Sequence, residues 1–546
     1  MLTLKEWVKK IWPLVLACAL LWVTILVLLV LVAQHNQGHL VYTLDDPYIH
    51  MAIAKNLVQH GTWSIDGHGF TSTSSSPLWV LLLAGTYVIF GINELSPLIL
   101  NFIFATSILA TATIVLQMYR VSQSWIFFTL LSIIFIAKIP SLVLCGQEHL
   151  LHASVTLLFV SVAVRDYSDT ERTRRRSMPL FFLTLLLPAI RYEGMFLVFV
   201  VGVMFALKRN YTIWFRLWAA AAFSVIVYGG ISIYHGSLFF PNPLLLNGNM
   251  PRLYSWNGIL QFLSNDAFRW IISEKNITVK IVLACVSLVF LWGWRSHKHS
   301  GHQAAGLLAV FIATALLQLQ FGKVGGPFLR YGAYLITFGI VCMSISIYEQ
   351  LQHADGLRVG VHQYLKRLVI SAGLIVCVAS FWYTAGKVIP LTIQAANNIY
   401  EQQYQMGLFL KWFYADTPVA VNDIGAVNYY SNIRCLDLYG LANVEITKAM
   451  MNGTYDVKQI DTFARKDNVE LAMVYDSWYS DKTGGLPPQW KKVGSWTIAH
   501  NVTCGDSVVS FYAVNPQAET RLIANLRAFS SQLPLDISQT GLYAQK

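Results

Sequence analysis

The stretch Tyr42-Thr-Leu-Asp-Asp-Pro-Tyr-Ile-His50 places two adjacent carboxylates, Asp45 and Asp46, shortly after the first long apolar segment, Ile11 to Ala33. That segment carries no charge and is long enough to cross the roughly 30 Å hydrocarbon core of a bilayer. Lysines precede it, so the positive-inside rule predicts a cytoplasmic N-terminus and an acidic pair on the opposite side. A cleaved signal peptide is the alternative, but the residues after Ala33 make a poor cleavage site. We therefore expect a first outer loop over residues 34–76.

The composition is that of a polytopic α-helical membrane protein. Hydrophobic residues make up 55% of the 546 residues and charged residues only 12%, with a mean hydropathy of +0.50, so too little charge is present to cover a soluble protein of this length. The net charge of +11 does not indicate nucleic-acid binding, because Lys and Arg fall largely in short loops between apolar runs, as in cytoplasmic loops. These loops contain Arg172 to Arg176, Lys208-Arg209, Arg295 to Lys298 and Lys366-Arg367.

The apolar runs predict about eleven transmembrane helices within residues 1–389. Pro47 to His60 reads first as an amphipathic helix on the membrane surface. Apolar runs follow at about 77–91, 97–118, 125–140, 149–164, 178–190, 193–207, 217–234, 279–294, 304–320, 331–348 and 368–389. If the basic loops are all cytoplasmic, one upstream run must fail to cross. Run 77–91 is the expected one, because it is shorter than the usual ~17–25 residues.

A soluble α/β domain is expected over residues 390–546. Short apolar or alternating runs between Gly, Pro and Asn turns predict strands mixed with helices. The predicted strands are Val419 to Val421, Glu470 to Tyr475, Trp496 to Ala499 and Val508 to Val514. The last span would run outward, which places this domain outside the cytoplasm. Cys435 and Cys504 could pair there.

The acidic pair could form a metal site, a proton relay, or a general base with a supporting carboxylate. Asp46 precedes Pro47 and is expected to cap the following helix, which leaves Asp45 as the expected base. Arg191 with Glu193 is either a local ion pair or a phosphate-binding group, and Arg330 has the same two readings.

These elements resemble the C-type glycosyltransferases (GT-C), integral-membrane enzymes that use polyprenyl-phosphate sugars. The likeness is closest to the arabinofuranosyltransferases of the mycobacterial cell wall and related bacterial proteins. This sequence departs from the family's motifs at two places. The family's Gly-Phe-Thr-Asn-Pro is lengthened here by Ser72-Thr-Ser-Ser-Ser, and its Arg-Pro-Glu-Gly is Arg191-Tyr-Glu-Gly here. The motifs that carry the resemblance are Leu44-Asp-Asp-Pro-Tyr-Ile, Gly69-Phe-Thr-Ser, Ser76-Pro-Leu-Trp79, Gly146-Gln-Glu, Arg191-Tyr-Glu-Gly, Pro241-Asn-Pro, Val421-Asn-Asp-Ile-Gly-Ala-Val-Asn-Tyr-Tyr-Ser431 and Asp437-Leu-Tyr-Gly-Leu441.

The resemblance implies an inverting glycosyltransferase of the bacterial inner membrane, with its C-terminal domain in the periplasm. It would move a sugar, with arabinofuranose as one candidate, from a polyprenyl-phosphate donor to a glycan, lipid or protein acceptor of the cell envelope. No cofactor is expected, and a metal ion at the acidic pair stays open. A transporter or flippase, and a glycan polymerase or ligase for lipid-linked sugars, are the alternatives.

The candidate site residues fall into three groups. The catalytic candidates are Asp45 and Asp46. The donor phosphate is expected to bind Arg191, Arg330 and Lys323. The candidates for substrate binding are Tyr48, His50, Glu148, His149, Tyr192, Glu193 and Asn242.

Overall fold

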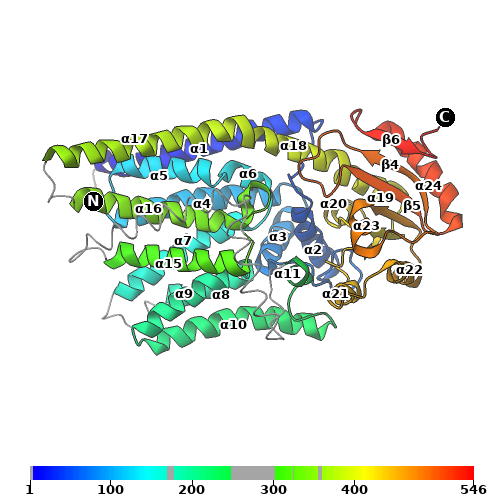
Figure 1. Ribbon diagram of the computed structural model, residues 1–546, viewed down its shortest axis with the longest axis horizontal. Helices are drawn as coiled ribbons and strands as arrows, with labels where there is room; N and C mark the ends of the chain where they lie inside the picture. Colours follow the sequence, from blue (N-terminus) through cyan, green and yellow to red (C-terminus); the bar gives the residue numbers. More distant parts are fainter. Residues whose placement is uncertain (1–3, 169–177, 248–301, 324, 354–358, 546) are drawn as a thin grey trace.

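The computed structural model describes residues 4–168, 178–247, 302–323, 325–353 and 359–545. A bundle of helices and a half that contains a β-sheet lie end to end along the long axis of the molecule (Figure 1). The chain is a multi-pass membrane protein with a sheet-containing C-terminal part.

The helical half is built from long apolar helices and several short ones. They are α1 (Leu4–His35), α2 (Asp46–His60), α3 (Pro77–Phe90), α4 (Ser96–Met118), α5 (Gln123–Ile136), α6 (Ile139–Leu144), α7 (His149–Ser168), α8 (Met178–Ile190), α9 (Gly194–Leu207), α10 (Tyr211–Tyr234), α11 (Asn242–Asn247), α15 (His302–Phe321) and α16 (Ala333–His353). In the described part of the chain, six helices are long and apolar enough to span a membrane and five apolar helices are shorter. These helices are compatible with about eleven crossings. The expected run at 279–294 lies outside the described residues.

A nearly continuous helical segment connects the two halves (Figure 1). It comprises α17 (Val359–Tyr383), the wider turn η5 (Thr384–Val388), α18 (Ile389–Ile399), a second wide turn η6 (Tyr400–Tyr404) and α19 (Gln405–Phe413). The domain boundary expected near Pro390 falls inside this segment. Pro390 lies at the start of α18, directly after the wide turn η5.

The C-terminal half contains a six-stranded mixed sheet in the order β2-β1-β3-β5-β4-β6. The pairs β2-β1 and β1-β3 are parallel, and the pairs β3-β5, β5-β4 and β4-β6 are antiparallel. The strands are β1 (Pro418–Val421), β2 (Arg434–Asp437), β3 (Leu471–Val474), β4 (Lys491–Thr497), β5 (Val508–Ala513) and β6 (Ser538–Gly541). The helices around it are α20 (Gly425–Tyr430), α21 (Val444–Met451), α22 (Val457–Lys466), α23 (Ser477–Thr483) and α24 (Pro516–Phe529).

The predicted strands at 419–421, 470–475 and 508–514 match β1, β3 and β5, and 496–499 overlaps only the end of β4. β2 and β6 were not predicted. In the parallel register, Val421 of β1 lies opposite Asp437 of β2 and Met473 of β3. The carboxyl ends of parallel strands share one edge of a sheet, where binding residues commonly gather. Asp423, Asp437 and Tyr475 all follow or end these strands at that edge.

Helix α2 differs from the expectation for its segment. The sequence predicted a helix lying on the membrane surface, but every residue from Pro47 to Asn56 is buried in the protein. α2 packs parallel to α20 of the C-terminal half, because Asp45 contacts the first turn of α20 and Lys55 reaches its last turn. The Lys55 ammonium donates to the carbonyls of Asn428 and Tyr429 at 2.9 and 2.8 Å.

Cys435 and Cys504 do not pair in the structure; both are free thiols. Cys435 Sγ accepts a hydrogen bond from the Asn428 amide at 3.3 Å, and the Cys504 thiol donates to the Gln403 side chain at 3.2 Å.

Candidate active site

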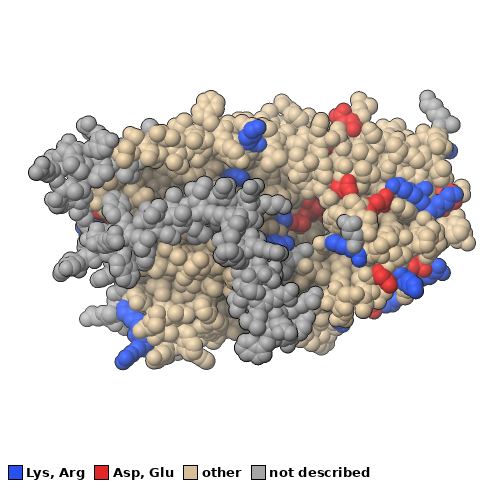
Figure 2. All heavy atoms as spheres, in the orientation of Figure 1, with Lys and Arg blue, Asp and Glu red and all other residues tan. Residues whose placement is uncertain are grey.

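A cavity of about 360 Å³ lies where the two halves meet. Its volume falls at the lower end of the range of small-molecule sites, ~300–1,000 Å³. On the face shown in Figure 2, acidic and basic atoms lie together in a hollow near the middle of the molecule. The cavity is lined by Asp46, Ile49, His50, Thr73, Ser75, Gln147, Arg191, Tyr192, Glu193, Phe196, Phe240, Pro243, Leu244, Phe321, Gly322, Lys323, Tyr331 and Leu441.

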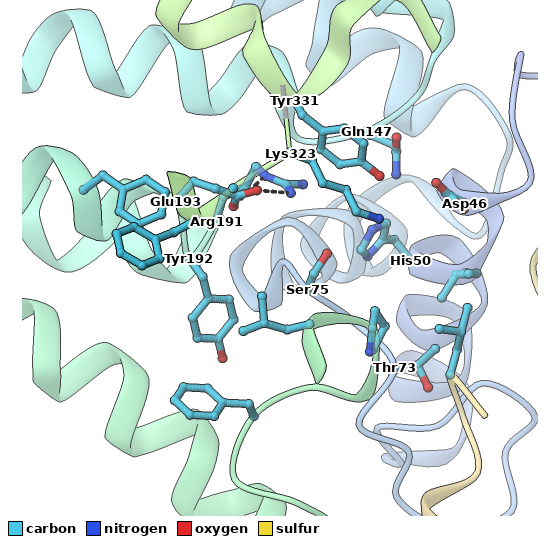
Figure 3. Close-up of a pocket in the computed structure, with 18 residues that line it drawn as sticks. Asp46, His50, Thr73, Ser75, Gln147, Arg191, Tyr192, Glu193, Lys323 and Tyr331 are labelled. Carbon is cyan, nitrogen blue, oxygen red and sulfur yellow. Dashed lines mark hydrogen bonds and ion pairs between the residues drawn. The ribbon is translucent and has the colours of Figure 1, made fainter. Parts of the chain in front are cut away.

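Asp46, at the start of α2, lies at the wall of this cavity (Figure 3). Its Oδ2 is 2.7 Å from Nη2 of Arg330, and its side chain is 43% exposed. Arg330 also donates to Oε1 of Gln147 at 3.0 Å and to the Tyr331 hydroxyl at 2.9 Å. Arg330 therefore contacts three residues that line the cavity and fixes their positions. The part of the Asp46 carboxylate that does not contact Arg330 stays open to the cavity.

Asp45 points the other way, into the contact with the C-terminal half. Its Oδ2 accepts the backbone N–H of Gly425 at 2.7 Å and its Oδ1 that of Ala426 at 2.8 Å. Burial raises the pKa of Asp45 well above its ordinary value, and the nearby carboxylate of Asp423 raises it further. The two amide bonds act in the opposite direction.

This geometry differs from the roles assigned from sequence. The residue before α2 is Asp45, whose side chain makes no cap bond, and Asp46 is paired with Arg330 instead of capping the helix. Asp46, not Asp45, is therefore the carboxylate that faces the cavity. Local capping rules consider only the next turn of chain, and they cannot register a partner such as Gly425 in another domain.

Arg191, in the turn between α8 and α9, is held by two acidic side chains. Its Nε and Nη2 bond to the two oxygens of Glu193 at 3.1 and 2.8 Å, and its Nη1 bonds to Oε1 of Glu148. The other oxygen of Glu148 lies 3.7 Å from Nε2 of His50. The local ion pair considered from the sequence is present, and the same guanidinium also lines the cavity.

His50 contributes its ring to the cavity wall. Burial lowers its pKa, an effect opposed by Glu148 and Asp46. Its Nδ1 lies 3.1 Å from the Ser74 hydroxyl, which comes from the Ser-rich loop before α3. This loop supplies Thr73 and Ser75 to the cavity (Figure 3).

Lys323 extends into the cavity from the end of α15 (Figure 3). Its Nζ lies 5.9 Å from the centre of the Tyr331 ring, and the guanidinium carbons of Arg191 and Arg330 lie 5.2 and 4.8 Å from the same centre. Among the described residues, no carboxylate is paired with Lys323. Arg191 and Arg330 are paired with carboxylates, so Lys323 is the cation at this end of the cavity that is best suited to bind an anionic group.

The predicted substrate-binding residues occupy different positions. His50, Tyr192 and Glu193 line the cavity. Glu148 and His149 are fully buried behind its wall.

Tyr48 and Asn242 do not line the cavity, so their positions give no support for substrate contact. The Tyr48 hydroxyl accepts the backbone N–H of Tyr42 at 3.1 Å. Asn242 donates to the carbonyl of Gly440 at 3.3 Å and so connects the helical half to the C-terminal half.

Asp423 is a site-adjacent carboxylate to which sequence reasoning gave no role. It accepts hydrogen bonds from the Tyr475 hydroxyl at 2.7 Å and the Gln403 amide at 2.8 Å, and burial raises its pKa. Its position directly after a parallel strand was the available signal. Within the described ranges, no group of three or more His, Cys, Asp or Glu side chains is arranged to hold a metal ion.

Solved structures of GT-C glycosyltransferases share this architecture. ArnT from Cupriavidus metallidurans bound to undecaprenyl phosphate is similar with a TM-score of 0.54 and 12% identity over 92% of this chain and 98% of ArnT. The apo state of ArnT is similar with a TM-score of 0.53 and 13% identity, over 92% of this chain and 98% of ArnT. The archaeal oligosaccharyltransferase AglB from Archaeoglobus fulgidus, in complex with an inhibitory peptide and a dolichol-phosphate, gives 0.48 and 11% over 98% of this chain and 77% of AglB.

These similarities show that the chain has the GT-C fold, which is the fold that the sequence motifs predicted. A family model described as Domain of unknown function (DUF8728) matches residues 397–512, which run from α18 to β5. No curated protein matches the sequence.

Proposed function

We propose that this chain is a glycosyltransferase that moves a sugar from a polyprenyl-phosphate donor to an acceptor hydroxyl outside the cytoplasm. One observation carries the proposal: a single cavity brings together a partly exposed carboxylate, Asp46, and the cations Arg191 and Lys323. In an inverting transfer, the acceptor oxygen bonds to the anomeric carbon, the bond from that carbon to the phosphate oxygen breaks, and the acceptor proton goes to a base.

The donor phosphate is assigned to the end of the cavity around Tyr331. A departing lipid phosphate gains negative charge in the transition state, and preorganised cations stabilise it there. Lys323 is the group best placed to bind it, because Arg191 is already engaged by two carboxylates. Arg330 acts indirectly, through Asp46, Gln147 and Tyr331.

An apolar hollow beside the cavity fits the polyprenyl chain. It has a volume of about 460 Å³ and lies between α9 and α15, and Phe321 lines both it and the charged cavity. A lipid whose phosphate lies at Lys323 could therefore keep its chain in this hollow. The lining residues are Phe199, Val200, Ala313, Leu316, Leu317, Leu319, Gln320 and Phe321.

Asp46 is the proposed general base, and Asp45 is a positioning residue. The open face of Asp46 can accept the proton of an acceptor hydroxyl, whereas both oxygens of Asp45 are occupied by amides of α20. Asp45 thereby ties α2, which carries Asp46, to the C-terminal half.

The charged groups gather at one end of the bundle, beside the C-terminal half, which favours a transferase over a transporter. Transporters commonly place ionisable groups near the bilayer midplane. We assign this end to the extracytoplasmic side of a bacterial inner membrane, with the N-terminus in the cytoplasm. A polymerase or ligase for diphosphate-linked glycans would use the same cations.

The test is a transfer assay with the purified full-length protein in nanodiscs. Short-chain polyprenyl-phosphoryl sugars, with arabinofuranose among them, are incubated with oligosaccharide acceptors, and release of polyprenyl phosphate is measured. Release that depends on acceptor and is lost in Asp46→Asn supports the proposal. Movement of intact lipid-linked sugar across proteoliposomes without transfer would instead identify a flippase, and turnover of diphosphate donors alone would identify a ligase.

A further inference from the structure

Two aromatic side chains of the C-terminal half form a corner beside the cavity. The ring centres of Tyr439 and Trp478 lie 5.0 Å apart at an angle of 52°, and both rings are half-buried. The exposed Lys482 reaches over them, with its Nζ 4.6 Å from the Tyr439 centre and 5.9 Å from the Trp478 centre. We call these three residues the aromatic subsite.

The loop that carries Tyr439 is held rigidly. Asp437, at the end of β2, accepts the backbone N–H of Tyr439 at 2.8 Å and that of Ala442 at 2.7 Å. Gly440 adopts φ +83°, a conformation that favours glycine, and its carbonyl accepts the Asn242 amide. The loop is thus fixed at both ends and also to the helical half.

Trp478 is held as firmly from the other side. Its indole N–H donates to the carbonyl of Gly505 at 3.3 Å. A Cβ at Gly505 would lie 2.3 Å from the Trp478 ring, so only glycine allows this approach. A pair of rings whose positions are fixed before binding loses little conformational entropy when a ligand stacks on it.

One loop connects the aromatic subsite to the proposed active site. Leu441, two residues after Tyr439 on the same fixed loop, lines the charged cavity. A chain of acceptor sugars whose reactive hydroxyl lies at Asp46 can therefore reach the two rings.

We propose that the aromatic subsite binds a sugar ring of the acceptor that carries a negative charge. The C–H face of a sugar is apolar with partial positive charge, which matches the electron-rich face of Tyr439 or Trp478. Lys482 adds a cation at the same place, and among the described residues no carboxylate forms an ion pair with it. An acidic saccharide satisfies both features, whereas a neutral one satisfies only the first. This inference rests on the proposed function only in identifying the bound sugar as part of the acceptor.

The test measures saccharide binding directly, by saturation-transfer NMR on the full-length protein in detergent. The probes are oligogalacturonate, which is acidic, and a neutral galacto-oligosaccharide of equal length. We expect Trp478→Ala to weaken binding of oligogalacturonate by about 3- to 10-fold, and Trp478→Phe, which keeps an aromatic face, to retain most of it. Lys482→Gln should reduce the preference for the acidic probe by about 2- to 5-fold.

The matched control is Trp412→Ala, the same change at a tryptophan that is 52% exposed on α19 and packs on Phe529, not on Tyr439. Unchanged binding in Trp478→Ala, an equal loss in Trp412→Ala, or no binding of either probe to the wild type would overturn the inference. Thermal stabilisation by polyprenyl phosphate is measured in the same samples. If the saccharide binds and polyprenyl phosphate does not, the subsite stands and the proposed donor site fails.

Discussion

Gly425 approaches Asp45 so closely that a Cβ on Gly425 would lie 2.1 Å from the backbone carbonyl oxygen of Asp45 and 2.7 Å from its Oδ2. The amide N–H of Gly425 uses this proximity to bond the same carboxylate. The first turn of α20 thus fits against the residue before α2 only because position 425 has no side chain. The carboxylate that faces the cavity, Asp46, follows directly on this contact.

Gly425→Ala should therefore loosen the contact between the halves. Because the obstructing atom belongs to the backbone, α20 must shift, at a cost of about 1–3 kcal/mol. We expect a lower midpoint of thermal unfolding in detergent, faster proteolysis between α19 and β1, and reduced transfer. Gly85→Ala is the matched control, since nothing lies within 4 Å of a Cβ at that position. Equal midpoints for the two variants would contradict the prediction.

The orientation in the membrane is tested by labelling of single cysteines in intact cells. Gln117 donates to the carbonyl of Lys10, so the exposed turn at Ser122 lies at the basic end of α1. A thiol reagent that does not cross membranes should label Gln489→Cys, in the exposed loop before β4, and spare Ser122→Cys. Labelling of Ser122→Cys alone would reverse the proposed orientation.

The gathering of charged groups was predictable from the sequence, because it follows from topology. Basic loops indicate which helix ends lie on the cytoplasmic side of the membrane. Asp46, Arg191 and Lys323 all lie at helix ends that this assignment places on the opposite side. The structure brings these three residues to one cavity.

The roles of the two aspartates were not predictable, for a physical reason. The partner amide of Asp45 belongs to Gly425, which is 380 positions away along the chain. The burial of α2 has the same origin, since its covering helix, α20, is contributed by the C-terminal half. Periodicity and capping report on neighbours within a turn or two, and contacts between domains lie beyond them.

Lys323→Gln should weaken donor binding with little effect on stability. A charged hydrogen bond contributes about 1.5–3 kcal/mol, so the affinity for polyprenyl phosphate should fall roughly 10- to 100-fold. Among the described residues, no carboxylate is paired with the Nζ of Lys323, which lies 5.9 Å from the Tyr331 ring centre, so the unfolding midpoint should be unchanged. Titration of the wild type, Lys323→Gln and the exposed-site control Lys458→Gln with polyprenyl phosphate measures this. Equal affinities would remove Lys323 from the donor site.

Stability should depend on pH through Asp437. Burial raises the pKa of Asp437 to about 6 from an ordinary 3.8, despite the amides that it accepts. A raised acid pKa means that the folded state binds more protons, so the contribution is complete below about pH 4 and is lost as pH rises through 6. At about 1.4 kcal/mol per pKa unit, the loss is about 3 kcal/mol. The unfolding midpoint of the wild type should therefore fall relative to Asp437→Asn between pH 4 and 7. Parallel pH profiles would contradict this.

Exchange of each aspartate for asparagine separates the two proposed roles. Asp46→Asn removes the base but keeps a group that can meet Arg330, so transfer should fall by about 10²–10⁴-fold while the unfolding midpoint and the binding of polyprenyl phosphate change little. Asp45→Asn turns an NH₂ group toward one of the two amides of α20, which leaves a buried donor unpaired at a cost of about 1–3 kcal/mol. This variant should unfold at a lower temperature and lose activity in proportion. Transfer rates, midpoints of thermal unfolding and affinities for polyprenyl phosphate, measured on both variants, show which aspartate is the base and which is the positioning residue. A stable but inactive Asp45→Asn beside an active Asp46→Asn would return the role of base to Asp45, because only loss of the reacting group removes turnover without loosening the fold.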